Sequence, residues 1–267
     1  MKKILLILLK IVATIYVVVC IGLYFYQEKL IFFPEKLAKN YKFDFPEKFE
    51  ELKFQVDDGK LLSGVLFKAD SSKGLVFYLH GNGGSIKGWG DIAKKYTDLH
   101  YDLFILDYRG YGKSEGEISS ESQIYSDLQI VYNNFKKSYQ ENQIVIIGYS
   151  IGTGLATELA STNHPKLLIL QAPYVSLVDM MRHRYPIIPT LFLKYRFETD
   201  RYIKACKMPV IIFHGNNDKV IYYESSLKLK ELFKSNDTLF TLDKQGHSGM
   251  NDNLLYLSEL KRVLEKQ

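Results

Sequence analysis

Ser150 lies between Gly148 and Gly152 in the stretch NQIVIIGYSIGTGLATELA, residues 142–160. A serine hydroxyl can act as a nucleophile when a base lies beside it and an acid orients that base. Serines with glycines two residues away also arise by chance, so the pattern alone is ambiguous. Here, however, an apolar strand pattern precedes Ser150 and a helical pattern follows it. A sharp turn between a strand and a helix exposes a serine hydroxyl, so we take Ser150 as the candidate nucleophile.

Two downstream residues have the types that a serine nucleophile needs. Asp218 follows the apolar run MPVIIFHG, and His247 follows the apolar run DTLFTLD. Taken singly, Asp218 could cap a turn, and His247 could be a surface loop residue. At the carboxyl ends of parallel strands, however, all three side chains would meet at one edge of a sheet. We therefore predict a catalytic set in which Ser150 attacks, His247 is the base and Asp218 orients that base.

The glycine-rich stretch HGNGGS, residues 80–85, follows another buried strand pattern. Glycines allow backbone N–H groups to approach the oxyanion of a tetrahedral intermediate closely. We expect the backbone N–H groups of Asn82 and Ile151 to form this oxyanion hole, with Gly83 as the alternative to Asn82.

His80 is an alternative base to His247, but it precedes a glycine at a strand end, which favours a bracing role. Together with Gly81 and Gly83, it is expected to support the oxyanion loop. His214 also precedes a glycine at a strand end, and we give it the same structural interpretation.

The elements that must position these residues alternate between strand and helix patterns. An antiparallel hairpin pattern at 51–69, turning at Asp58-Gly59, comes first. Continuous apolar runs, typical of strands buried on both faces, follow at 74–81, 101–110, 143–149, 166–173, 208–215 and 237–243. Helical patterns lie at 86–99, 121–139, directly after Ser150, at 222–235 and at 252–266. This alternation predicts an α/β fold with a mostly parallel, doubly wound sheet.

The sequence predicts a membrane anchor, a connector and one domain. Residues 4–26 are the expected anchor, and residues 27–49 form a juxtamembrane connector whose aromatic side chains either touch lipid or pack on the domain. Residues 50–267 are expected to form the domain. Within it, residues 174–207 interrupt the alternation with prolines, aromatic residues and four arginines, which indicates a short helical lid.

The expected anchor carries Lys10 as its one charge over 23 residues. About 20 apolar residues span a bilayer core, and the closing aromatic residues 24–26 are typical of a membrane interface. A cleaved signal peptide and lipoprotein processing at Cys20 are the alternatives. The length of the apolar run and the bulky Val19 before Cys20 favour a retained transmembrane helix.

Charge and cysteine content narrow the functional classes. The net charge of +5 comes from lysines spread along the chain, a weak signal for nucleic-acid binding, which we do not expect. The chain has two cysteines and no C-x-x-C pair, so we expect no metal site and no cofactor. Lys2, Lys3 and Lys10 outweigh the mixed Glu28-Lys29 flank, so we expect a cytoplasmic N-terminus and an extracytoplasmic domain.

Five motifs, in this order along the chain, resemble those of the serine α/β-hydrolase superfamily. They are HGNGGS, DYRGYGKSEG (107–116), GYSIG, HGNND and GHSG. The pattern is most similar to its membrane-anchored branch with a minimal lid, which has depalmitoylase-type and serine aminopeptidase-like relatives. The resemblance covers the anchor, the FFPEKL connector and residues 50–265. It implies the α/β-hydrolase fold and an acyl-enzyme on Ser150, with His247 as general base and then acid. It also implies that residues 107–116 shape the floor of the site.

These features predict a membrane-tethered serine hydrolase of an ester or thioester with an acyl chain, from a small-molecule or lipid-like substrate. An aminopeptidase or amidase of the same fold is an alternative, but it would need acidic lid groups to hold the substrate amine. The lid carries four arginines against Asp179, Glu198 and Asp200. A catalytically inactive, membrane-anchored scaffold is a third alternative. Dehalogenase and epoxide hydrolase chemistries need an aspartate at the turn, where this chain has Ser150.

Overall fold

The structure is a computed structural model that describes residues 1–265, so the expected domain end at 267 and helix end at 266 lie outside the described residues. Its central sheet comprises β2 (Phe49–Gln55), β3 (Leu61–Phe67), β4 (Leu75–Leu79), β6 (Asp102–Leu106), β7 (Ile144–Tyr149), β8 (Leu167–Gln171), β9 (Val210–Gly215) and β10 (Thr238–Leu242). Their order across the sheet is β10-β9-β8-β7-β4-β6-β3-β2. β3 pairs antiparallel with both β2 and β6, and the six strands from β6 to β10 in this order pair in parallel. The predicted mostly parallel α/β sheet is confirmed.

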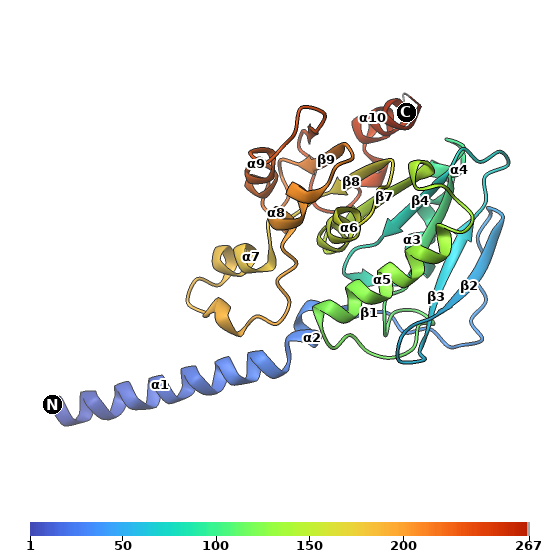
Figure 1. Cartoon of the computed structure of the whole chain (residues 1–267). Helices are drawn as coiled ribbons and strands as arrows, with labels where there is room; N and C mark the ends of the chain where they lie inside the picture. Colours follow the sequence, from blue (N-terminus) through green and yellow to red (C-terminus); the bar gives the residue numbers. More distant parts are fainter. Residues whose placement is uncertain (266–267) are drawn as a thin grey trace.

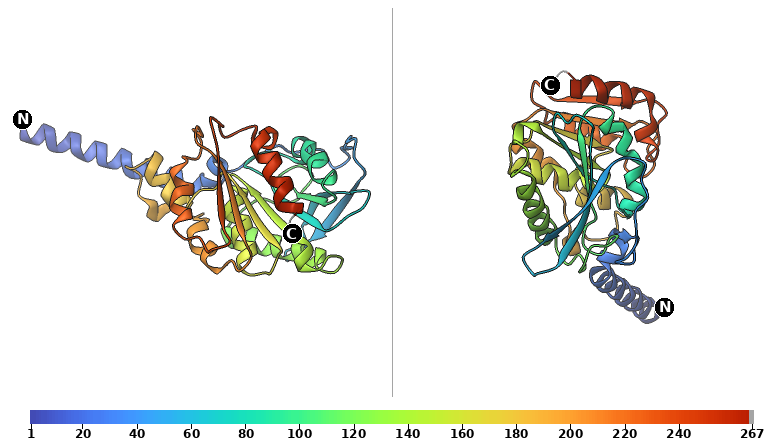
Figure 2. Two further views of the ribbon diagram at one scale, coloured as in Figure 1. Left: turned by 90° about the horizontal axis from the view of Figure 1, so that it is seen from above. Right: turned by 90° about the vertical axis from the view of Figure 1, so that its right-hand side faces the viewer.

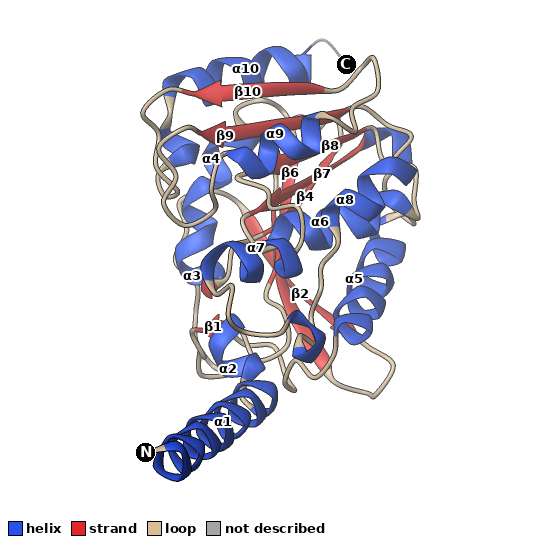
Figure 3. Cartoon of the chain, turned by 90° about the vertical axis from the view of Figure 1, so that its left-hand side faces the viewer, coloured by secondary structure: helices blue, strands red, loops and turns tan. Residues whose placement is uncertain are grey.

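Helices cover both faces of the sheet (Figures 1 and 3). One face packs against α5 (Glu121–Phe135), α6 (Gly152–Ser161) and α9 (Glu224–Lys230). The other packs against α3 (Ile86–Trp89), α4 (Ala93–Thr97) and α10 (Leu254–Glu265). Every residue of β4, β6, β7, β8 and β9 is buried, which explains why these strands read as unbroken apolar runs in the sequence.

The segment between β8 and β9 leaves the sheet, and its residues 174–207, the expected lid, are called the lid below. It contains α7 (Leu177–Arg184), a 3-10 turn at Thr190–Phe192 and α8 (Thr199–Tyr202). Ser176 begins α7 as an N-cap, and its hydroxyl accepts a hydrogen bond from the Asp179 N–H. The lid lies on the same side of the molecule as the N-terminal helix (Figures 1 and 2).

The N-terminal helix α1 (Lys2–Phe25) extends away from the domain (Figures 1 and 2). Its 24 residues give a length of about 36 Å, and it is long and apolar enough to cross a membrane. The short helix α2 (Gln27–Ile31) follows.

The connector packs on the domain beyond α2. Phe43 is buried and stacks on Phe45. In the same connector, β1 (Phe33–Pro34) pairs in parallel with β5 (Gly83–Gly84). Residues 80–85, called the glycine loop below, are therefore held from one side by the connector.

Candidate active site

Ser150 lies at the sharp turn between β7 and α6. Its backbone φ of 54° falls in the left-handed region, which is costly for a residue with a side chain. The flanking glycines explain how the chain fits this turn. A Cβ on Gly148 would lie 2.5 Å from the Gly152 carbonyl oxygen, and one on Gly152 would lie 2.1 Å from the Leu79 carbonyl oxygen. The Ser150 N–H donates to the Gln171 carbonyl oxygen of β8 at 2.9 Å, which anchors the turn to the sheet.

The structure brings Ser150, His247 and Asp218 together from three separate loops. His247 Nε2 lies 3.0 Å from Ser150 Oγ, and His247 Nδ1 lies 2.7 Å from Asp218 Oδ2. An ionised carboxylate only accepts hydrogen bonds, so the proton of a neutral His247 belongs on Nδ1. The lone pair on Nε2 is then directed at the Ser150 hydroxyl, which is the arrangement for removing its proton.

Asp218 is held by hydrogen bonds to both of its carboxylate oxygens. Oδ1 accepts from the N–H groups of Val220 at 2.8 Å and Ile221 at 2.9 Å. His214 Nε2 lies 3.3 Å from Oδ2. Burial acts to raise the pKa of Asp218, but hydrogen bonds from His214 and His247 outweigh it and hold this pKa well below its usual range. Asp218 is therefore ionised at neutral pH.

His214 is a site residue whose role the sequence reasoning missed. We interpreted it only as a structural residue before a glycine, yet its side chain adjoins the Asp218 carboxylate. The motif HGNND contains a usable signal, because His214 precedes Asp218 by four residues at the end of β9. A tight turn after a strand end brings such a pair back into contact.

The two expected oxyanion donors come from two different elements near Ser150. Ile151 follows it directly at the start of α6, and Asn82 lines the same cavity as Ser150. Within residues 1–265, neither backbone N–H donates a hydrogen bond. The Asn82 carbonyl oxygen accepts from Tyr111 Oη at 2.7 Å, and its side-chain Oδ1 accepts from the Phe33 N–H at 3.3 Å. These contacts fix the glycine loop while leaving the Asn82 N–H available to a ligand.

His80, the first residue of the glycine loop, is fully buried. Its Nδ1 lies 2.7 Å from the Gly81 carbonyl oxygen, and its ring stacks on Trp89 and packs against Tyr108. Burial lowers the pKa of His80 to about 4, so it is neutral at pH 7. Its Nε2 lies 3.8 Å from Asp107 Oδ1, and burial raises the pKa of that carboxyl to about 7. These contacts join His80 to Gly81, Trp89 and Tyr108, and its bracing role stays a prediction.

A cavity of about 760 Å³ adjoins the Ser150 and His247 side chains. The glycine loop and Trp89 form part of its wall. Such a volume lies within the usual range for a small-molecule site. Among residues 1–265, no three His, Cys, Asp or Glu side chains are grouped so as to hold a metal ion.

Known proteins match this chain in sequence and in structure. A family model described as serine aminopeptidase, S33, matches residues 70–200. An uncharacterized protein of Acanthamoeba polyphaga mimivirus is 26% identical over 238 residues, covering 79% of this chain and 80% of that protein. Protein bem46 of Schizosaccharomyces pombe is 28% identical over 215 residues, covering 74% of this chain and 72% of that protein.

A lipase and an esterase are also among these similar proteins. The lysophosphatidylserine lipase ABHD12 of Danio rerio is 31% identical over 190 residues, covering 63% of this chain but only 50% of the lipase. The chain thus matches about half of that relative's length. A Pyrococcus furiosus esterase superposes with a TM-score of 0.68 at 18% identity, covering 88% of this chain and 96% of the esterase, which shows the same fold.

Proposed function

The chain belongs to the serine α/β-hydrolase superfamily, and from this we propose that it is a membrane-tethered serine hydrolase. Its reaction is the cleavage of a carboxylic ester or thioester through an acyl-enzyme on Ser150. The single observation that carries the proposal is the hydrogen-bonded line from Ser150 Oγ through His247 to Asp218 Oδ2.

The mechanism follows from the roles of these atoms. His247 Nε2 takes the proton as Ser150 Oγ attacks the acyl carbonyl carbon. Charge then develops on the carbonyl oxygen, which the N–H groups of Asn82 and Ile151 stabilise. Asp218 stabilises the imidazolium that forms. His247 next protonates the leaving group, and the acyl-enzyme is hydrolysed when His247 removes a proton from water.

An ester substrate is favoured over an aminopeptidase substrate because two of the three lid carboxylates, Glu198 and Asp179, are already paired with cations. Glu198 pairs with Arg196 at 3.0 Å and Arg201 at 3.2 Å. Asp179 pairs with Lys228 at 2.8 Å. A substrate ammonium group would have to compete with these cations. The relatives described as a lipase and an esterase point the same way.

Residues 4–26 serve in this proposal as a single transmembrane anchor, residues 27–49 as its connector and residues 50–267 as the hydrolase domain with its lid. Lys2, Lys3 and Lys10 favour a cytoplasmic N-terminus and an extracytoplasmic domain. Protease added to intact cells should therefore digest the domain. Protection of the domain until the membrane is opened would reverse this orientation.

A hydrolysis assay on the full-length protein tests the proposed reaction. The substrates are p-nitrophenyl esters of graded chain length, matched thioesters and aminoacyl amides. Esters or thioesters should be cleaved, and Ser150→Ala should lower kcat by about 10³-fold or more. Faster cleavage of aminoacyl amides than of any ester would favour the aminopeptidase. No turnover by folded protein would favour the scaffold.

A further inference from the structure

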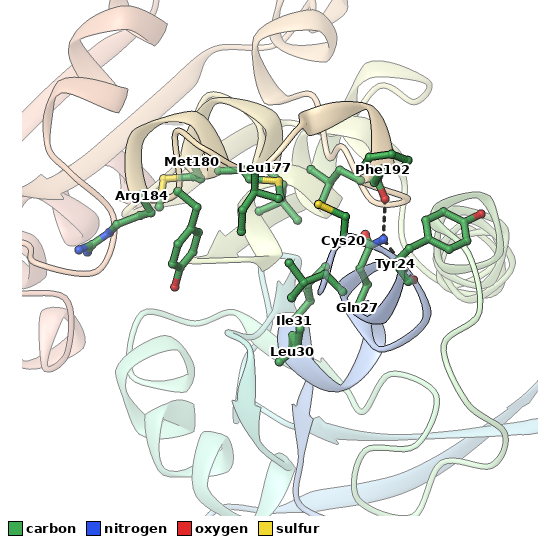
Figure 4. A pocket seen from close by; sticks show the side chains of 14 residues that line it. Cys20, Tyr24, Gln27, Leu30, Ile31, Leu177, Met180, Arg184 and Phe192 are labelled. Carbon is green, nitrogen blue, oxygen red and sulfur yellow. Dashed lines mark hydrogen bonds between the residues drawn. The ribbon is translucent and has the colours of Figure 1, made fainter. Parts of the chain in front are cut away.

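A second cavity, of about 460 Å³, lies between the lid and the end of the membrane helix (Figure 4). The side chains of Leu30 and Ile31 face those of Leu177 and Met180 across it. The N-terminal side of the wall is completed by the end of α1, from Cys20 onward. This lining is predominantly apolar, and its volume is that of a site for a small ligand.

The lid reaches along the part of α1 that would lie in the membrane. The Tyr16 hydroxyl donates to the Ile187 carbonyl oxygen at 2.6 Å. Tyr16 precedes the end of α1 at Phe25 by nine residues, or about 14 Å of helix. The lid side chains Ile187 and Leu191 are 78% and 87% exposed. If α1 spans the bilayer, this apolar lid tip lies within the adjacent leaflet, where the Tyr16 bond satisfies a carbonyl that lipid cannot.

The apolar cavity is next to the cavity that contains Ser150. On one side, Ile31 lines the apolar cavity, and the N–H of nearby Phe33 donates to Asn82 Oδ1 at 3.3 Å. On the other side, Arg184 lines the apolar cavity and donates to the Val220 carbonyl oxygen at 3.2 Å. Asn82 and Val220 both line the Ser150 cavity. One hydrogen bond, from Arg184 to Val220, thus joins the walls of the two cavities directly, and the Phe33–Asn82 bond lies two residues along the chain from Ile31.

We propose that the apolar cavity binds the acyl chain of a bilayer lipid, which enters between α1 and the lid while its ester carbonyl reaches Ser150. This inference rests on the proposed hydrolase function and adds the origin and binding place of the acyl group. The acyl chain of the lipid passes from the apolar bilayer into the apolar cavity, so its entry requires no exposure to water. Because the lid tip lies in the leaflet, the apolar cavity opens at the depth at which the acyl chains of the lipids lie.

Photocrosslinking of a lipid tests this binding place without requiring catalysis. The full-length Ser150→Ala protein is reconstituted in phosphatidylcholine vesicles that contain phosphatidylcholine with a diazirine near one chain end. After illumination, adducts should map to the lid at 177–193. Met180→Trp fills the cavity and should reduce these adducts about fivefold or more. Leu254→Trp is the matched control, because Leu254 is 83% exposed on α10, far from the lid, and its adducts should not change.

Two results would overturn the proposal: adducts confined to the outer surface of α1, or equal lid adducts in the Met180→Trp and Leu254→Trp proteins. Leu177→Trp, from the same wall, replaces Met180→Trp if the latter has a reduced thermal midpoint. Crosslinking in the cavity without any ester hydrolysis by the wild type would reject the proposed function alone. Hydrolysis that depends on Ser150, without lid adducts, would reject the acyl-chain cavity alone.

Discussion

His214 Nε2 lies 3.3 Å from Asp218 Oδ2, the same oxygen that His247 Nδ1 approaches at 2.7 Å. His214 also contacts Ser226 Oγ through Nδ1 at 2.7 Å, which fixes its ring. Asp218 therefore has a partner on the strand β9 side that is independent of the base. The His214 contact therefore helps to hold the pKa of Asp218 below its usual range in addition to the contact with His247.

Replacing His214 should weaken the dependence of the protein's stability on pH in the acid range. A carboxyl with a lowered folded pKa stabilises the protein above its unfolded pKa of about 4, and this stability is lost as the pH falls through the folded pKa. His214→Leu should raise the pKa of Asp218 and cost about 1.5–3 kcal/mol at pH 7. The difference from the wild type should shrink below about pH 4. Thermal midpoints from pH 2.5 to 7 measure this, and a constant difference would contradict it.

Asp107 should lower the stability of the protein as the pH rises, whereas Asp218 raises it, and Asp107 should act at higher pH than Asp218. Burial raises its folded pKa to about 7, so the folded state retains a proton that the unfolded state releases near pH 4. The stability that this group contributes therefore falls by up to about 4 kcal/mol as the pH rises from about 4 to about 7, and it stays level above that range. Asp107→Asn removes the titration, so its thermal midpoint should gain on the wild type across this window. Parallel midpoints would show that Asp107 does not titrate there.

The tight packing at Gly152 predicts a large difference between two glycine substitutions. In Gly152→Ala the new Cβ would lie 2.1 Å from the Leu79 carbonyl oxygen, whereas a Cβ on Gly88 meets nothing within 4 Å. Overpacking of about 3 kcal/mol corresponds to a fall of about 6–12 °C in the thermal midpoint. Gly88→Ala should shift the midpoint by less than about 2 °C. Similar shifts for the two variants would count against the close approach of Gly152 to β4.

The oxyanion role of Asn82 concerns its backbone N–H rather than its side chain. Asn82→Pro removes this N–H and should lower kcat by about 10²–10³-fold. Asn82→Ala retains it and loses only the two side-chain contacts, with the Phe33 N–H and with Tyr111 Oη, so we expect a fall below about tenfold. Steady-state kinetics on one ester, with thermal midpoints as the folding control, compare the two. Equal losses of kcat would assign the effect to the side chain.

Most of the fold was predictable because the five central strands β4, β6, β7, β8 and β9 are fully buried and read as unbroken apolar runs. The structure of residues 86–99 was harder to predict, because the single helix expected there is divided into α3, a 3-10 turn and α4. Gly90 lies at this division, where a Cβ would come 2.4 Å from the Phe45 ring. That close packing arises from the connector, which is distant in sequence, so local periodicity does not contain it.

The sequence allowed the residues of the candidate site to be predicted, because suitable residue types follow strand ends. It did not allow the contacts around them to be predicted. Ser150, Asp218 and His247 each follow a recognisable strand, so their meeting at one sheet edge could be inferred. The pairing of β1 with the glycine loop was not predicted, since two-residue strands have no periodicity to detect. The apolar cavity was also hidden, because its walls come from α1, α2 and the lid, which lie far apart in the sequence.

Fluorophosphonate labelling of the full-length protein tests the central claim most directly, since this reagent phosphonylates an activated serine. The labelled peptide is identified by mass spectrometry, and the Ser150→Ala protein is treated in parallel. The hydrolase mechanism predicts a single phosphonyl group on Ser150 in the wild type and none in the variant. No label on folded wild-type protein, or undiminished labelling of Ser150→Ala, would contradict the assignment of Ser150 as the nucleophile.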